Sequence, residues 1–306
     1  MTWPTLYPDL WPLLRDTTGR LEVGNMHVVL QASCIGLTFN VWEFLVTLGD
    51  EVDLVWLCRP SSWTLRLVRG LFFFSRYAGL MVQSINIVVA ENMSSYRSVP
   101  NVFCTRWISY QIIVIFLFLS VVNLILNLRI YAIYRRSRRM CALLTVIFFS
   151  RLVLATPFAI VYTPRLAFDG MCGFRIPLPI MLAFLFVEMA TQSFTLVLTF
   201  MRRMVSPNRA SSRMSLISML YRDAVLTYLA VFSALAATLV YGRVASFQGQ
   251  AHFVFPLFVS ILSTSACRMV IDMQELALNS RSRSESTEPF VFTSILEVLD
   301  PTEELV

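Results

Sequence analysis

Long apolar stretches recur along the chain, and short segments containing charged residues, proline or glycine separate them. A helix needs about 20 predominantly apolar residues to cross the hydrocarbon core of a bilayer. Stretches of about that length lie at residues 26–48, 68–90, 108–133, 141–163, 178–200, 220–242 and 252–274. This pattern predicts an all-α fold, a multi-pass transmembrane helical bundle with seven spans.

The composition supports this prediction. Hydrophobic residues make up 57% of the chain and charged residues 14%, whereas about 25% of the residues in soluble domains are charged. All 25 basic residues are arginines. The absence of lysine excludes a retinal-binding opsin, because such a protein needs a lysine to form its Schiff base.

The arginines in the connecting segments predict the orientation of the bundle. Cytosolic loops of membrane proteins carry an excess of basic residues. Here the segments on one side hold twelve arginines and those on the other side hold seven. Four of the twelve form a basic turn between the third and fourth spans, made of Arg135, Arg136, Arg138 and Arg139. We therefore expect an outside N-terminus and a cytosolic C-terminus.

The predicted spans divide the chain into three parts. Residues 1–25 form an extracytoplasmic segment without the apolar core of a signal peptide, and residues 26–274 form the transmembrane domain. Residues 275–306 are rich in serine and acidic side chains, a composition that predicts a disordered cytosolic tail. The expected partners are the lipid bilayer and, at the basic loops, a cytosolic signalling protein or anionic lipid head groups.

Three residues in the predicted outside loops have chemistry that suits an oxidising compartment. Cys104 precedes the third span and Cys172 lies between the fourth and fifth spans, so a disulfide between them is expected, with two unpaired cysteines as the alternative. Asn92 begins an Asn-Met-Ser glycosylation sequon, and whether it is used stays open. Together with the outside N-terminus, the sequon favours the plasma membrane.

Charged residues also lie inside the predicted spans. An ionised side chain at the bilayer centre costs about 2.5–3.5 kcal/mol, so Arg151 in the fourth span and Glu188 in the fifth each need a partner. We favour a buried Arg151–Glu188 ion pair, with a ligand or ion pathway as the alternative. Arg76 in the second span is expected to pair with Glu43 or Asp50.

Uncharged polar residues inside the spans are expected to stabilise helix packing. Interhelical hydrogen bonds are predicted for Asn86, Asn123, Asn127 and Gln192. Cys34 and Cys267 are predicted to be small packing residues.

Catalytic and metal-binding motifs are not found in the sequence. GxSxG, HExxH and glycine-rich phosphate loops do not occur. The acidic run Asp50-Glu51-Val52-Asp53 occurs once, whereas a diphosphate-binding Mg²⁺ site usually needs two such runs. We expect these acidic side chains to neutralise neighbouring arginines. The chain is therefore predicted to have no enzymatic activity, no cofactor and no nucleic-acid partner, and its ligand is unknown.

The first two spans resemble a known family. The run Trp42–Val52, followed by Trp56 and by Phe73-Phe74-Ser75-Arg76-Tyr77, is similar to a fungal, mushroom-type family of uncharacterised membrane proteins. That family has an N-terminal domain of unknown function, which corresponds to residues 26–90. Further matches are Leu128–Ala132, Tyr221-Arg222-Asp223 and Arg268. Glu43 stands where the family more often has Asp. The resemblance implies a seven-pass membrane protein without an established activity.

A receptor-like seven-helix sensor is the function that we favour. The span count, the orientation, the two loop cysteines and the basic loops all agree with it. Arg129-Ile130-Tyr131 is loosely similar to the arginine-containing triplet of receptors, although Leu128 replaces the usual acidic residue. One alternative is a transporter or channel, for which the repeated Phe-Phe-Ser-Arg at 73–76 and 148–151 gives weak support. The other is a membrane scaffold or lipid-interacting protein.

Overall fold

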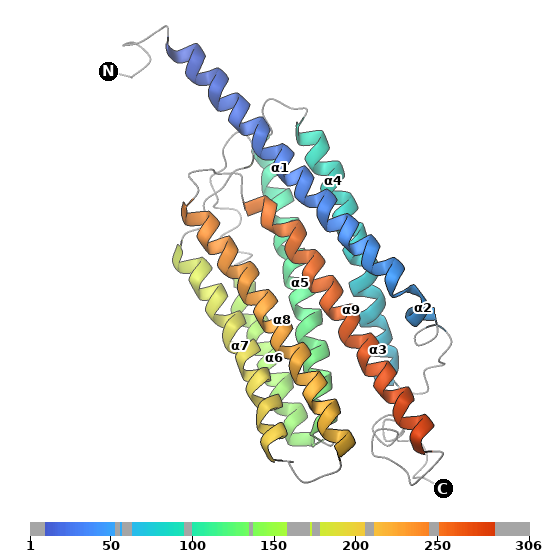
Figure 1. Cartoon of the computed structure of the whole chain (residues 1–306). Helices are drawn as coiled ribbons and strands as arrows, with labels where there is room; N and C mark the ends of the chain where they lie inside the picture. Colours follow the sequence, from blue (N-terminus) through green and yellow to red (C-terminus); the bar gives the residue numbers. More distant parts are fainter. Residues whose placement is uncertain are drawn as a thin grey trace.

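The computed structural model of the chain describes residues 10–52, 56, 63–94, 100–134, 137–157, 172, 178–205, 211–244 and 251–284. In these ranges the chain is helical apart from short turns and has no strand. Figure 1 shows the resulting helical bundle. Its elements are α1 (Leu10–Val46), α2 (Leu48–Glu51), α3 (Trp63–Phe73), η3 (Phe74–Ala78), α4 (Gly79–Ser94), α5 (Asn101–Ile133), α6 (Arg138–Pro157), α7 (Leu178–Val205), α8 (Ser211–Val244) and α9 (Ala251–Ser284).

Seven long helical segments make up the described bundle, because α3, η3 and α4 follow one another without a break. Successive segments run in opposite directions along the bundle (Figure 1). One end carries Cys104 and Cys172, and we call it the disulfide end. The opposite end carries the short helix α2, and we call it the α2 end.

Five of the described helical segments are long and apolar enough to cross a membrane. They contain the stretches His27–Val46, Arg66–Met93, Asn101–Ala132, Leu182–Met201 and His252–Gln274. The other two long helices are α6 and α8, and α8 contains a shorter apolar stretch, Ala224–Ala237. The fold is therefore all-helical and compatible with an integral membrane protein. The count of seven spans and the orientation stay predictions.

Two helices extend beyond the predicted spans. Helix α1 begins at Leu10 and α9 continues to Ser284. Residues 10–25 and 275–284, which the sequence pattern leaves outside the transmembrane domain, are therefore helical. Apolar periodicity marks the part of a helix that faces lipid or core, whereas a helix propagates through polar residues as well.

Helix α9 is the central helix of the bundle. It packs against α1, α4, α5 and α8, and 78% of its apolar stretch is buried, against 22–50% for the other four. Its apolar side packs into a core that includes Phe118 of α5, Val231 of α8 and Phe72 of α3. Any movement of α9 therefore changes contacts with most of the bundle.

Small and polar residues line the contact of α1 with α4 and α9. On α1 they recur every three or four residues, which places them on one helix face; they are Ser33, Gly36, Asn40, Glu43 and Thr47. We call this contact the polar seam. Gln83 of α4 donates to the Pro256 carbonyl (2.6 Å) and to Ser260 Oγ (2.9 Å) of α9. Ser260 Oγ in turn donates to the Gly36 carbonyl (3.1 Å). Small side chains allow this close approach of three backbones.

The second long helical segment contains one turn of π-helix, η3. It lies against α9, where Ser263 Oγ donates to the Ser75 carbonyl at 2.8 Å. A Cβ on Gly79 would lie 2.5 Å from Ser263 Oγ, so this approach requires glycine. The wide turn places the side chains of Ser75 and Arg76 inside the bundle, where both are buried.

Candidate functional site

A cluster of charged and aromatic residues lies at the α2 end, with Arg76 at its centre. The Arg76 side chain is 4% exposed, and its Nε lies 2.6 Å from Glu51 Oε2. Its Nη1 donates to Thr47 Oγ1 (2.6 Å) and its Nη2 to the Phe44 carbonyl (2.8 Å). The guanidinium also lies over the Phe44 ring, 4.4 Å from the centroid. A buried cation is thus surrounded by an anion, two oxygen acceptors and an aromatic face.

Glu51 connects this arginine to two aromatic side chains. Its carboxylate is fully buried, and Oε1 accepts hydrogen bonds from Trp56 Nε1 (3.1 Å) and Tyr77 Oη (3.2 Å). Both rings also pack against Phe73, Trp56 edge-on and Tyr77 stacked. Each carboxylate oxygen therefore has a polar partner, as a buried charge requires.

A second ion pair joins the same end of α1 to α9. Arg268 Nε and Nη2 donate to the two oxygens of Glu43 at 2.6 and 2.8 Å, which is a bidentate arrangement. Glu43 is 7% exposed and Arg268 63% exposed. The next residue of α9, Met269, accepts a hydrogen bond from Arg129 of α5 through its carbonyl. Two arginines thus tie one turn of α9 to α1 and to α5.

The predicted partner of Arg76 is partly wrong. Arg76 pairs with Glu51, while Glu43 pairs with Arg268; the side chain of Asp50 lies outside the described residues. Arg76 pairs with Glu51 because the chain changes direction after α1, so that α2 places Glu51 next to η3. Glu43 instead faces α9. The expectation that the acidic run neutralises neighbouring arginines holds for Glu51, which is the last residue of the short helix α2.

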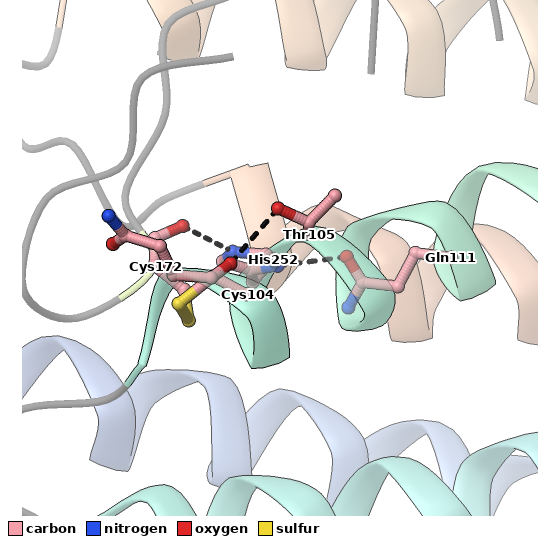
Figure 2. The surroundings of a disulfide bond; sticks show 6 residues. Cys104, Thr105, Gln111, Cys172 and His252 are labelled. Carbon is pink, nitrogen blue, oxygen red and sulfur yellow. Dashed lines mark hydrogen bonds between the residues drawn. A yellow bond between two sulfur atoms is a disulfide. The ribbon is translucent and has the colours of Figure 1, made fainter. Parts of the chain in front are cut away.

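The disulfide end holds a second polar cluster, which Figure 2 shows. Cys104 at the start of α5 and Cys172 form a disulfide, with their Cα atoms 5.0 Å apart. The Cys172 carbonyl lies 3.1 Å from His252 Nε2, and His252 Nδ1 lies 2.8 Å from Gln111 Oε1. The His252 ring stacks on Trp107 with the centroids 4.0 Å apart. The disulfide thus holds Cys172 against the first turn of α9.

Three hydrogen-bond donors in this second cluster are buried without a hydrogen-bond partner within the described part of the chain. They are Trp107 Nε1, Tyr110 Oη and Gln111 Nε2. All three belong to one turn of α5, so they lie on adjacent positions of one helix face. A buried donor without an acceptor costs about 1–3 kcal/mol, so this turn favours an additional acceptor that the described residues do not supply.

The structure also brings together the two charged residues near the middle of the predicted fourth and fifth spans. Arg151 of α6 and Glu188 of α7 are 1% and 0% exposed. Arg151 Nε and Nη2 both lie 2.7 Å from Glu188 Oε1, and Nη1 donates to Ser120 Oγ of α5 (3.1 Å). The pair therefore joins three helices through an interior contact.

Other predicted site residues have different outcomes. Asn92 is exposed in α4 and donates to the Val88 carbonyl of its own helix. In the basic turn, Arg138 and Arg139 are exposed at the start of α6, and Arg135 and Arg136 lie outside the described residues. Cys267 is buried as predicted, but Cys34 is exposed.

The predicted interhelical amides also differ among themselves. Asn86 Nδ2 donates across the polar seam to Ser33 Oγ (3.4 Å). Asn123 Nδ2 instead donates to the Leu119 carbonyl within α5, so its predicted interhelical role is wrong for this donor. For Asn127 Oδ1 and Gln192 Nε2, the described structure offers no hydrogen-bond partner.

Three residues make specific contacts between helices but were not predicted as site residues: Gln83 in the polar seam, Ser263 at η3 and His252 at the disulfide end. The available signal was the spacing of polar and small residues on α1, which recurs every three or four positions between residues 33 and 47. Such spacing indicates a packed helix face. This spacing could have indicated that α1 has a polar partner helix, but it does not identify that helix.

The comparisons with known proteins give one family. Residues 31–81 match the Family of unknown function (DUF6533). The matched region contains Glu43, Thr47, Glu51 and Arg76, so most of the cluster at the α2 end lies within the residues that match this family of unknown function. Comparisons with curated proteins and with solved structures each found no protein that matches this chain.

Proposed function

We propose that the chain is a seven-pass membrane protein of the plasma membrane that works as a receptor-like sensor. The disulfide end lies outside and the α2 end faces the cytosol, in agreement with the arginine distribution. Helices α6 and α8 are then the fourth and sixth spans. The basic turn, including Arg138 and Arg139, is exposed on the cytosolic side, where it meets a signalling partner or anionic lipid head groups.

One observation carries this proposal: α9 takes part in both polar clusters. His252 in its first turn contacts Cys172 and Gln111 at the disulfide end, and Arg268 pairs with Glu43 at the α2 end. These two residues lie about 24 Å apart along a helix that rises 1.5 Å per residue. A helix that is largely buried between these two residues and makes specific polar contacts in both clusters can carry a displacement from one cluster to the other.

The three α5 donors that have no hydrogen-bond partner among the described residues supply the input site of this sensor. Trp107, Tyr110 and Gln111 offer an indole N–H, a phenol O–H and an amide N–H. Trp107 and Gln111 also contact His252 directly. A ligand with acceptor oxygens would satisfy them and change the contacts of His252 at the same time. Because His252 belongs to α9, binding would act directly on the central helix.

Signalling in a reconstituted system tests the proposal. The chain in lipid nanodiscs is mixed with a heterotrimeric G protein, and nucleotide exchange is followed across a broad panel of oxygen-rich small molecules. We expect at least one compound to accelerate exchange with the native chain, with the response lost in R268Q. R106Q is the matched control, because Arg106 is an exposed arginine on the opposite end of the bundle. A flat response with the native chain across the panel contradicts the sensor.

The orientation has its own test. Cys141 is exposed at the start of α6, on the side assigned to the cytosol. In a C34S/C58S variant expressed in whole cells, a membrane-impermeant maleimide should label Cys141 only after the cells are permeabilised. Labelling of intact cells contradicts the orientation.

Transport is the second candidate, and the Arg151–Glu188 pair is the observation that favours it. Ionisable residues within spanning helices often mark ion or substrate pathways. The repeated Phe-Phe-Ser-Arg gives less support, since 74–76 belong to the π-helix η3 while 148–151 belong to the regular helix α6. Vesicles that contain the chain should show an ion flux that E188Q abolishes. Vesicles without flux, together with a flat signalling response, favour a scaffold.

A further inference from the structure

The π-helical turn η3 lies at the point where the second long helical segment meets both α9 and the α2-end cluster. A single π-turn inside an α-helix accommodates one extra residue, and such turns are frequent at functional sites. The residues before and after it, in α3 and α4, are α-helical. The position of the wide turn therefore sets the rotational register of the residues around it.

This register determines where the Arg76 side chain points. An α-helix turns by about 100° per residue. Suppose that the wide turn moved along the helix past residue 76. The residues that it passed would then leave the α-helical register on one side of the turn and join the register on its other side, which rotates their side chains by about 100° around the helix axis. Arg76 would then leave Glu51, Thr47 and the Phe44 carbonyl.

A contact from α9 holds the wide turn where it is. Ser263 Oγ donates to the Ser75 carbonyl inside η3, and Gly79 lets Ser263 approach, since a Cβ there would lie 2.5 Å from its Oγ. Ser263 and Ser260 both belong to the side of α9 that meets the polar seam. A displacement of α9 along that seam therefore acts on η3.

We propose that η3 is a register switch that Ser263 latches. While Ser263 donates to the Ser75 carbonyl, Arg76 stays within the cluster; when α9 moves away, the wide turn shifts and Arg76 is released. This inference rests on the proposed function for its signal, because α9 is the helix that the ligand acts on. The latch itself exists without ligand and is measured without it.

Cys267 is a probe for the release of Arg76. Its side chain is 4% exposed, its thiol is free, and it contacts the Arg76 side chain. In a C34S/C58S/C141S background, Cys267 is the remaining thiol beside the Cys104–Cys172 disulfide. Its alkylation by N-ethylmaleimide, in phosphatidylcholine nanodiscs, reports how often the cluster opens.

Removing the latch should increase this opening. We expect S263A to raise the alkylation rate of Cys267 about fivefold, the effect of losing one ordinary hydrogen bond. S265A is the matched control, since it makes the same change two residues away on the partly exposed side of α9, and its rate should equal that of the parent. Equal rates for S263A and S265A overturn the latch.

A double-mutant cycle shows whether the effect passes through Arg76. E51Q removes the carboxylate that holds Arg76 and should itself raise the alkylation rate. If Ser263 acts by holding Arg76 in place, adding S263A to E51Q raises the rate less than twofold further. Two effects that multiply independently overturn the switch, because Ser263 would then protect Cys267 by another route.

The outcomes separate this inference from the proposed function. The alkylation measurements use neither ligand nor G protein, so a failed latch leaves the signalling assay standing. A flat signalling response contradicts the proposed sensor function. It does not contradict the latch, which depends only on the contact between Ser263 and η3. A positive result in both assays predicts that the activating compound raises Cys267 alkylation in the parent and not in S263A.

Discussion

Replacing Glu51 by glutamine removes one charge from the centre of the α2-end cluster and little else. Glutamine has nearly the same shape, and its amide oxygen can still accept from Trp56 and Tyr77. Arg76 keeps Thr47 and the Phe44 carbonyl but loses its buried counter-ion at 2.6 Å. The substitution therefore isolates the cost of an uncompensated buried cation.

The expected cost follows from the burial of both partners. Their side chains are 4% and 0% exposed, and breaking a buried pair by removing one partner costs about 3–5 kcal/mol. We expect E51Q to lower Tm by roughly 6–12 °C, measured by circular dichroism in detergent micelles. E91Q is the control, because Glu91 is exposed and the loss of a charge at such a position costs about 0–1 kcal/mol.

A double variant tests the reasoning itself. Replacing both partners by apolar side chains of similar size, in E51L/R76M, leaves no orphaned charge. Such replacements of buried ion pairs are often neutral or stabilising, so this variant should melt close to the native chain. If E51L/R76M melts as low as E51Q, or E51Q melts like E91Q, the cost does not come from an uncompensated charge and the argument is wrong.

Three further predictions concern single contacts. G79A should lower the free energy of unfolding by about 1–3 kcal/mol, because the added methyl group overpacks against Ser263. G70A, whose methyl group meets open space beside α3, should raise it by about 0.5–1 kcal/mol. Denaturant titration measures both variants, and equal effects contradict the prediction. C104S/C172S should cost about 2–4 kcal/mol, and non-reducing peptide mapping of the native chain should recover the two cysteines in one cross-linked peptide pair. E188Q removes the buried counter-ion of Arg151 and should cost about 3 kcal/mol, while S150A, at an exposed position of α6 next to Arg151, should melt like the native chain.

The all-helical fold and the pair Arg151–Glu188 followed from local information. Apolar stretches of span length are a property of consecutive residues, and two interior charges on consecutive spans have few other partners. The pair Arg76–Glu51 did not follow, because it depends on the direction in which α2 turns the chain. The contact between Ser263 and η3 was also out of reach, since no pattern along the chain indicates a π-turn or shows that Gly79 faces a helix almost two hundred residues later.

The polar seam also has a consequence for how the chain is made. Helices α1 and α4 are synthesised early, yet Glu43 and Gln83 find their partners on α9, and the Glu43–Arg268 pair spans 225 positions. At about 5–20 residues per second, the ribosome needs roughly 10–45 s to reach that partner. During this interval the first helices carry a carboxylate and an amide that the completed protein buries. A chain that stops before α9 therefore lacks the partners that both groups have in the complete fold.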